Sequence, residues 1–129
     1  MQLYPLNDER LLSLNLPKQN SIDALIYRFL VIQDHIGNKL FPLIAKIINP
    51  GSQQISWFDT LAIMEKYNVI TSELDWDNIR KLRNLFAHEY DENPDVRAQD
   101  INALIDTLPV LAKQIILINT YANQLLLAT

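Results

Sequence analysis

The chain has 129 residues, 49% of them hydrophobic, and a net charge of −4. This length suits about one domain, so we expect a single domain over 1–129. The absence of cysteine excludes a disulfide framework, a thiolate zinc site and a cysteine nucleophile, and it fits the reducing cytoplasm. A protein that holds nucleic acid by bulk electrostatics is usually basic, so contact with RNA would need a local site.

No basic segment precedes an apolar run at the start, so we expect no signal peptide. No stretch reaches roughly 18 uninterrupted apolar residues, so we expect no membrane span. Residues 1–19 are expected to form an N-terminal arm or a short helix. Apolar residues over 21–48 fall on more than one side of a helix, which predicts burial against more than one neighbour, including a second subunit. Asn20 or Ser21 would cap this helix, and Pro42 would kink it or end it early.

Three further helices are expected, separated by short polar loops; they span about 57–67, 73–90 and 94–127. Ser56 and Ser72 each stand three residues before an acidic residue, which is typical of a helix start. Pro94 suits the first position of the last helix, and Pro109 would bend it. Because short loops join antiparallel neighbours, the pattern predicts an all-α, up-and-down antiparallel bundle of four main helices.

The eight residues from Arg83 to Tyr90 read R-N-x-x-A-H-x-Y. Cleavage of RNA without a metal needs a cation to hold phosphate, an imidazole to move a proton, and polar groups to orient both. On a helix that turns about 100° per residue, Arg83, Ala87 and Tyr90 share one face. Asn84 and His88 are four residues apart and form the adjacent edge. The segment therefore predicts a shallow polar ledge suited to a backbone phosphate.

This pattern resembles the R-x4-6-H motif of HEPN domains, and in particular the HepT-like branch with R-x4-H-x-Y. The resemblance implies a HEPN-like homodimer in which both subunits build one RNase site, acting as the toxin of a toxin–antitoxin pair. It implies that Arg83 binds the scissile phosphate and that His88 transfers a proton during attack of the ribose 2′-hydroxyl. Asn84 would position these groups. Tyr90 would be modified with AMP by an MNT-fold nucleotidyltransferase antitoxin.

Asp34 and His35 are the other notable polar residues, both in the first long helix. A carboxylate surrounded by apolar sequence is costly to bury alone. Asp34 would therefore pair with Arg83, orient His88, or face a lysine at the surface. Many HEPN domains carry an acidic residue near the site on an early helix. His35 shares a polar strip with two basic residues and is interpreted as a surface residue.

Simpler interpretations compete with this site. The basic cluster of Arg80, Lys81 and Arg83 overlaps the motif, and Arg80 and Lys81 could be solvated charges. Arg83 could be a solvated charge or an ordinary ion-pair partner, and His88 could be stabilised as an imidazolium at the helix C-terminus. The chain could then be a non-catalytic HEPN protein that binds a nucleotidyltransferase partner or a nucleotide, or a dimeric helical scaffold. The sequence has no metal-ligand spacing and no phosphate-binding glycine loop, so we expect no metal and no cofactor.

Overall fold

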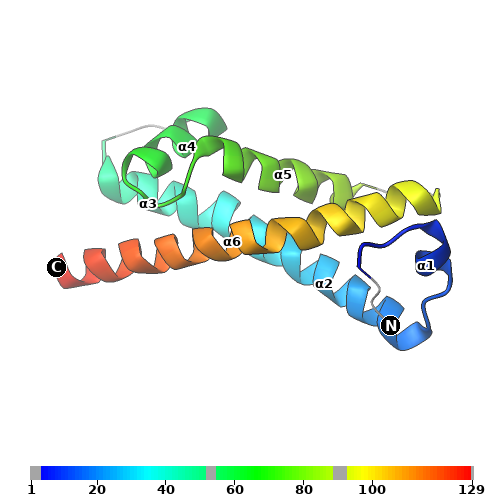
Figure 1. Cartoon of the computed structure of the whole chain (residues 1–129). Helices are drawn as coiled ribbons and strands as arrows, with labels where there is room; N and C mark the ends of the chain where they lie inside the picture. The colour runs from blue at the N-terminus through cyan, green and yellow to red at the C-terminus, as the bar shows by residue number, and fades with distance from the viewer. Residues whose placement is uncertain (1–3, 52–54, 89–92, 129) are drawn as a thin grey trace.

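The computed structural model describes residues 4–51, 55–88 and 93–128, and this part of the chain contains helices and no strand (Figure 1). The all-α prediction is therefore confirmed. In chain order the elements are α1 (Asp8–Leu12), α2 (Leu16–His35), a π-helical segment η1 (Ile36–Leu40), α3 (Phe41–Ile48), α4 (Trp57–Lys66), α5 (Glu73–Ala87) and α6 (Pro94–Ala128).

Helix α5 occupies the centre of this arrangement. It packs against α2, α4 and α6, while α1 lies against α6 and α3 lies against α4. In Figure 1, α6 is the longest element and crosses α2 near the middle of the molecule. The helix that carries Arg83 and Asn84 is therefore held by three neighbours, which fixes the position of the residues along it.

Helix α2 begins earlier than predicted. Its N-cap is Asn15, whose side chain accepts a hydrogen bond from the N–H of Lys18 at 3.0 Å. The predicted cap at Asn20 or Ser21 is wrong because Pro17 already lies in the first turn, where a proline sacrifices no intrahelical hydrogen bond. Ser21 lies inside the helix and donates its hydroxyl proton back to the carbonyl of Pro17 at 3.0 Å.

The predicted interruption near Pro42 is present and takes the form of the π-helical segment η1, which ends directly before α3. A proline has no N–H to donate to the carbonyl four residues earlier, so the regular α-helical pattern cannot run through Pro42 unchanged. Such π-helical turns inside α-helices occur frequently at functional sites. Gly37 lies in this segment and is buried.

The later helix starts follow the sequence prediction. The side chain of Ser56 accepts from the N–H of Asp59 at 3.1 Å, and that of Ser72 accepts from the N–H of Asp75 at 3.0 Å. Helix α6 opens at Pro94 and continues through Pro109 to Ala128.

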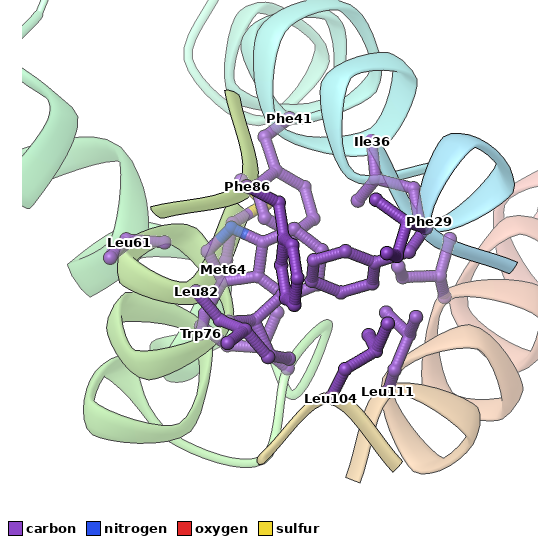
Figure 2. Packing of buried hydrophobic residues seen from close by; sticks show 14 of the residues in the cluster. Phe29, Ile36, Phe41, Leu61, Met64, Trp76, Leu82, Phe86, Leu104 and Leu111 are labelled. Carbon is purple, nitrogen blue, oxygen red and sulfur yellow. The ribbon is translucent and has the colours of Figure 1, made fainter. Parts of the chain in front are cut away.

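Buried hydrophobic side chains from α2 to α6 form one cluster (Figure 2). Trp76 is fully buried, and its ring meets that of Phe41 edge-on, with centroids 4.8 Å apart and planes at 61°. Helix α5 has an apolar stripe of four residues spaced three or four apart, and all four are buried; they are Trp76, Ile79, Leu82 and Phe86. Helix α5 therefore turns this stripe inward and its polar edge outward.

Two amide side chains of α6 hold the connecting segments in place. Asn102 accepts from the N–H of Leu6 at 2.7 Å and donates to its carbonyl at 2.8 Å. Gln114 is fully buried and accepts from the N–H of Thr71 at 3.0 Å, just before α5 begins. These contacts dock the N-terminal arm and fix the start of α5.

Among the described residues, one helix, α6, is long and apolar enough to cross a membrane. Its most apolar 18-residue window has a mean hydropathy of 1.6, and 28% of that window is buried. Core helices of soluble proteins pass the same test, so this finding is weak evidence. The expectation of a protein without a membrane span stays a prediction.

Candidate functional site

The motif helix ends earlier than predicted. Helix α5 stops at Ala87, and His88 is its C-cap, with extended backbone angles φ −83° and ψ 163°. The N–H of His88 still donates to the carbonyl of Asn84 at 3.3 Å. The predicted continuation of this helix to about residue 90 is wrong, because the backbone of His88 is extended and the chain leaves the helix there. The predicted position of Tyr90 lies outside the described residues.

Arg83 and Asp34 form a bidentate ion pair between α5 and α2. Arg83 Nε lies 2.6 Å from Asp34 Oδ1, and Nη2 lies 2.9 Å from Oδ2. The side chains are 28% and 38% exposed, respectively. The pairing of Asp34 with Arg83, one of the alternatives for this carboxylate, is therefore present. Parallel N–H···O bonds of this kind fix the plane of the guanidinium as well as its position.

The pair fixes the plane of the Arg83 guanidinium and uses only part of its hydrogen-bonding capacity. A guanidinium has five N–H donors, and Asp34 uses two of them, so donors remain for a phosphate. The hydrogen bonds from Arg83 hold the pKa of the Asp34 carboxyl below its ordinary value, and the carboxylate raises the pKa of Arg83. Both groups therefore keep their charges at neutral pH. Because the two charges offset each other, binding would depend on N–H geometry more than on net charge.

The polar edge of α5 is open to solvent near its C-terminal end. Arg83 is half-buried, whereas Asn84, Ala87 and His88 are exposed. A phosphodiester approaching this edge would reach the free donors of Arg83 and the end of the helix at His88 without displacing the core.

The two neighbouring basic residues differ from each other. Lys81 is 71% exposed and pairs with Asp77 at 3.0 Å, so its interpretation as a surface charge is confirmed. Arg80 instead stacks on the indole of Trp57, with its guanidinium carbon 4.3 Å from the ring centroid. Trp57 was not predicted as part of the site, because nothing in the sequence spacing links the start of α4 to the middle of α5.

The remaining predicted polar residue, His35, is exposed, as expected. Among the described residues, no three His, Asp or Glu side chains gather as potential metal ligands. A hollow of about 210 Å³ is lined by Thr71, Lys113, Ile116 and Leu117. None of the predicted site residues lines this hollow. The candidate site is instead the solvent-exposed edge of α5 near Arg83.

Comparisons of the chain with family models, with curated proteins and with solved structures find no match. The candidate site therefore rests on the residues of the motif and on their geometry.

The Asp34–Arg83 pair makes a stability prediction. The pKa of Asp34 is lower in the folded protein than in the unfolded chain. The contribution of the ionised carboxylate to the free energy of unfolding is therefore complete above the unfolded pKa of about 3.9 and is lost as the pH falls through the folded pKa. Asp34→Asn should therefore be less stable than wild type at pH 7, by at most about 1 kcal/mol for a pair this exposed. The difference should be constant from pH 5 to 8 and shrink below about pH 4.

Urea unfolding of both proteins across this pH range measures the effect. Asp77→Asn, which removes the pair with exposed Lys81, is the matched control and should change stability less at pH 7. A difference between wild type and Asp34→Asn that stayed constant down to pH 2 would contradict the account of the pair.

Proposed function

We propose that this protein is a metal-independent RNA endonuclease that acts as the toxin of a HEPN/MNT-type toxin–antitoxin pair, in a HEPN-like antiparallel bundle. One observation carries the proposal: Asp34 orients the half-buried Arg83 through two hydrogen bonds, and the exposed His88 follows at the end of the same helix. This geometry supports the proposal, because Arg83 would bind the anion and His88 would transfer the proton along one open edge of α5.

The chemistry follows from these groups. The free donors of Arg83 bind the non-bridging oxygens of the scissile phosphate and stabilise the negative charge that develops there. The imidazole of His88 takes the proton of the ribose 2′-hydroxyl as its oxygen attacks phosphorus. The bond from phosphorus to the 5′-oxygen breaks, a proton is delivered to that oxygen, and the products are a 2′,3′-cyclic phosphate and a 5′-hydroxyl. Asn84 positions His88 or the phosphate.

A homodimer completes the proposed site. The resemblance implies that Arg83 and His88 of both subunits act together, so one imidazole can accept a proton while the other donates one. Exposed apolar side chains on α2 and α3 support association, since Tyr27, Leu43 and Ile47 are 68%, 55% and 50% exposed. A two-fold interface would place the same surface of each subunit in contact. We further propose that the dimer works in the cytoplasm, outside any membrane.

Tyr90 is the proposed modification site, on the strength of the resemblance alone. Attachment of AMP by a cognate MNT-fold nucleotidyltransferase would add a phosphate seven residues after Arg83, where it could compete with substrate through charge-assisted hydrogen bonds. Tyr90→Phe removes the acceptor oxygen and keeps the ring. We expect this variant to retain at least part of its RNase activity and to resist silencing by the partner enzyme supplied with ATP.

Intact-mass measurement after that incubation checks the prediction. Wild type should gain adenylyl groups and Tyr90→Phe should gain none. Equal additions on both proteins would place the modification elsewhere, and silencing without a change in mass would indicate inhibition by binding alone.

A second function is favoured by the net charge of −4. A non-catalytic HEPN protein could use the same edge of α5 to bind a nucleotide, or bind a nucleotidyltransferase partner. It would share the fold and the partner but not the reaction. Expression of the protein separates the two: growth arrest that His88→Ala removes supports the nuclease.

A further inference from the structure

The edge of α5 that carries Arg83 extends one turn further towards the N-terminus, to Arg80. These two residues are three apart, so they lie about 4.5 Å apart along the helix axis and roughly 60° apart around it. Arg80 is half-buried. Its guanidinium lies over the indole of Trp57, 4.3 Å from the ring centroid. A flat cationic surface therefore adjoins the proposed phosphate site.

Among the residues that the structure describes, Arg80 has no carboxylate partner, unlike its neighbours Lys81 and Arg83. Lys81 pairs with Asp77, and Arg83 pairs with Asp34. The guanidinium of Arg80 instead contacts the ring of Trp57. In a protein with a net charge of −4, an arginine held against an aromatic ring keeps its positive charge available to a ligand.

The position of Trp57 depends on the π-helical segment. A Cβ atom placed on Gly37 would lie 3.3 Å from the Trp57 ring and 3.1 Å from the amide nitrogen of Gln33. The missing side chain therefore lets the indole lie close to η1. Asp34, which orients Arg83, lies three residues before Gly37, in the last turn of α2. The end of α2 and the start of η1 thus support both the Arg83 pair and the Trp57 stack.

We propose that Arg80 and Trp57 form a stacking subsite for an unpaired nucleobase of single-stranded RNA, next to the phosphate site at Arg83. Guanidinium planes and aromatic rings are the surfaces on which proteins stack splayed-out bases. The inference rests on the proposed function, because it names the substrate as single-stranded. A duplex would keep its bases in its own stack and leave this surface empty.

The subsite is tested by binding, without cleavage. The probe is an eight-nucleotide, 2′-O-methyl RNA without self-complementarity, which lacks the 2′-hydroxyl needed for the reaction. Stacking is worth about 1–3 kcal/mol per base, so Arg80→Ala should weaken binding by about 5- to 150-fold. Arg80→Lys keeps the charge but loses the plane, and it should fall between wild type and Arg80→Ala. Lys81→Ala, the matched control on the same helix, should bind within about twofold of wild type.

A second readout separates base stacking from charge. Removing single bases from the probe, to leave abasic positions, should weaken binding to wild type at one position and should have no effect there in Arg80→Ala. Binding of the probe should also quench the fluorescence of the partly exposed Trp57, because Trp76 is fully buried. Trp57→Phe should remove that quenching, while its far-ultraviolet circular dichroism shows that it is folded.

The outcomes separate this subsite from the proposed reaction. Wild-type affinity of Arg80→Ala and Arg80→Lys, or an equal effect of abasic positions in all variants, overturns the subsite, even if the protein cleaves RNA. Base-dependent binding that Arg80→Ala abolishes, in a protein that cleaves no RNA, supports the subsite and refutes the nuclease. Equal affinity for single-stranded and duplex probes contradicts the subsite.

Discussion

Arg83→Ala and His88→Ala should each lower the rate of RNA cleavage by about 10²–10⁴-fold, the usual effect of losing general acid–base catalysis or a positioned charge. Both side chains lie off the buried stripe of α5, so the fold should persist. In Arg83→Ala, the carboxylate of Asp34 is left without its partner but already has 38% of its surface in water. In His88→Ala, the backbone contact to Asn84 is kept.

Single-turnover rates with a short single-stranded RNA measure this effect. His35→Ala is the matched control, since His35 is the other histidine of the chain and is exposed. It should cleave like wild type. If His88→Ala kept the wild-type rate while circular dichroism showed a folded protein, His88 would have no part in the reaction.

Trp76→Ala should cause the largest loss of stability, about 3–5 kcal/mol. Trp76 is fully buried, and its ring meets Phe41 at the centre of the core (Figure 2). Since the total stability of a domain is about 5–15 kcal/mol, this single change would remove a large part of it and weaken the packing that holds α5.

Urea unfolding measures this loss of stability, from the shift in the urea concentration at the midpoint when the dependence of the unfolding free energy on urea is unchanged. Leu74→Ala is the matched control on the same helix, because Leu74 is 66% exposed, and it should cost less than about 0.5 kcal/mol. Equal losses in the two variants would contradict the central place of Trp76 in the core.

The sequence predicted the helices well where capping and apolar spacing agree. Ser56, Ser72 and Pro94 mark helix starts that the structure confirms. The start of α2 was misplaced because several polar residues could serve as its cap; Asn15 does so, and Pro17 then lies in the first turn. The end of α5 was predicted about three residues too late, since nothing in the local sequence distinguishes His88 from the helical residues before it.

The candidate site was predictable only in part. Arg83 and Asp34 could be suggested as partners because a carboxylate in apolar surroundings needs a cation, and their pairing is present. The stack of Arg80 on Trp57 was not predictable from spacing. The indole of Trp57 lies beside η1, where the missing side chain of Gly37 leaves room for it, and the position of a π-helical turn depends on tertiary contacts rather than on local sequence.

The most direct test of metal-independent cleavage is an RNase assay on the purified protein in excess EDTA, with analysis of the fragment ends by mass. The account predicts unchanged activity in EDTA, fragments that end in a 2′,3′-cyclic phosphate and a 5′-hydroxyl, and no such fragments from His88→Ala. Loss of activity in EDTA, fragments with a 5′-phosphate, or an absence of cleavage by the wild-type protein would contradict it.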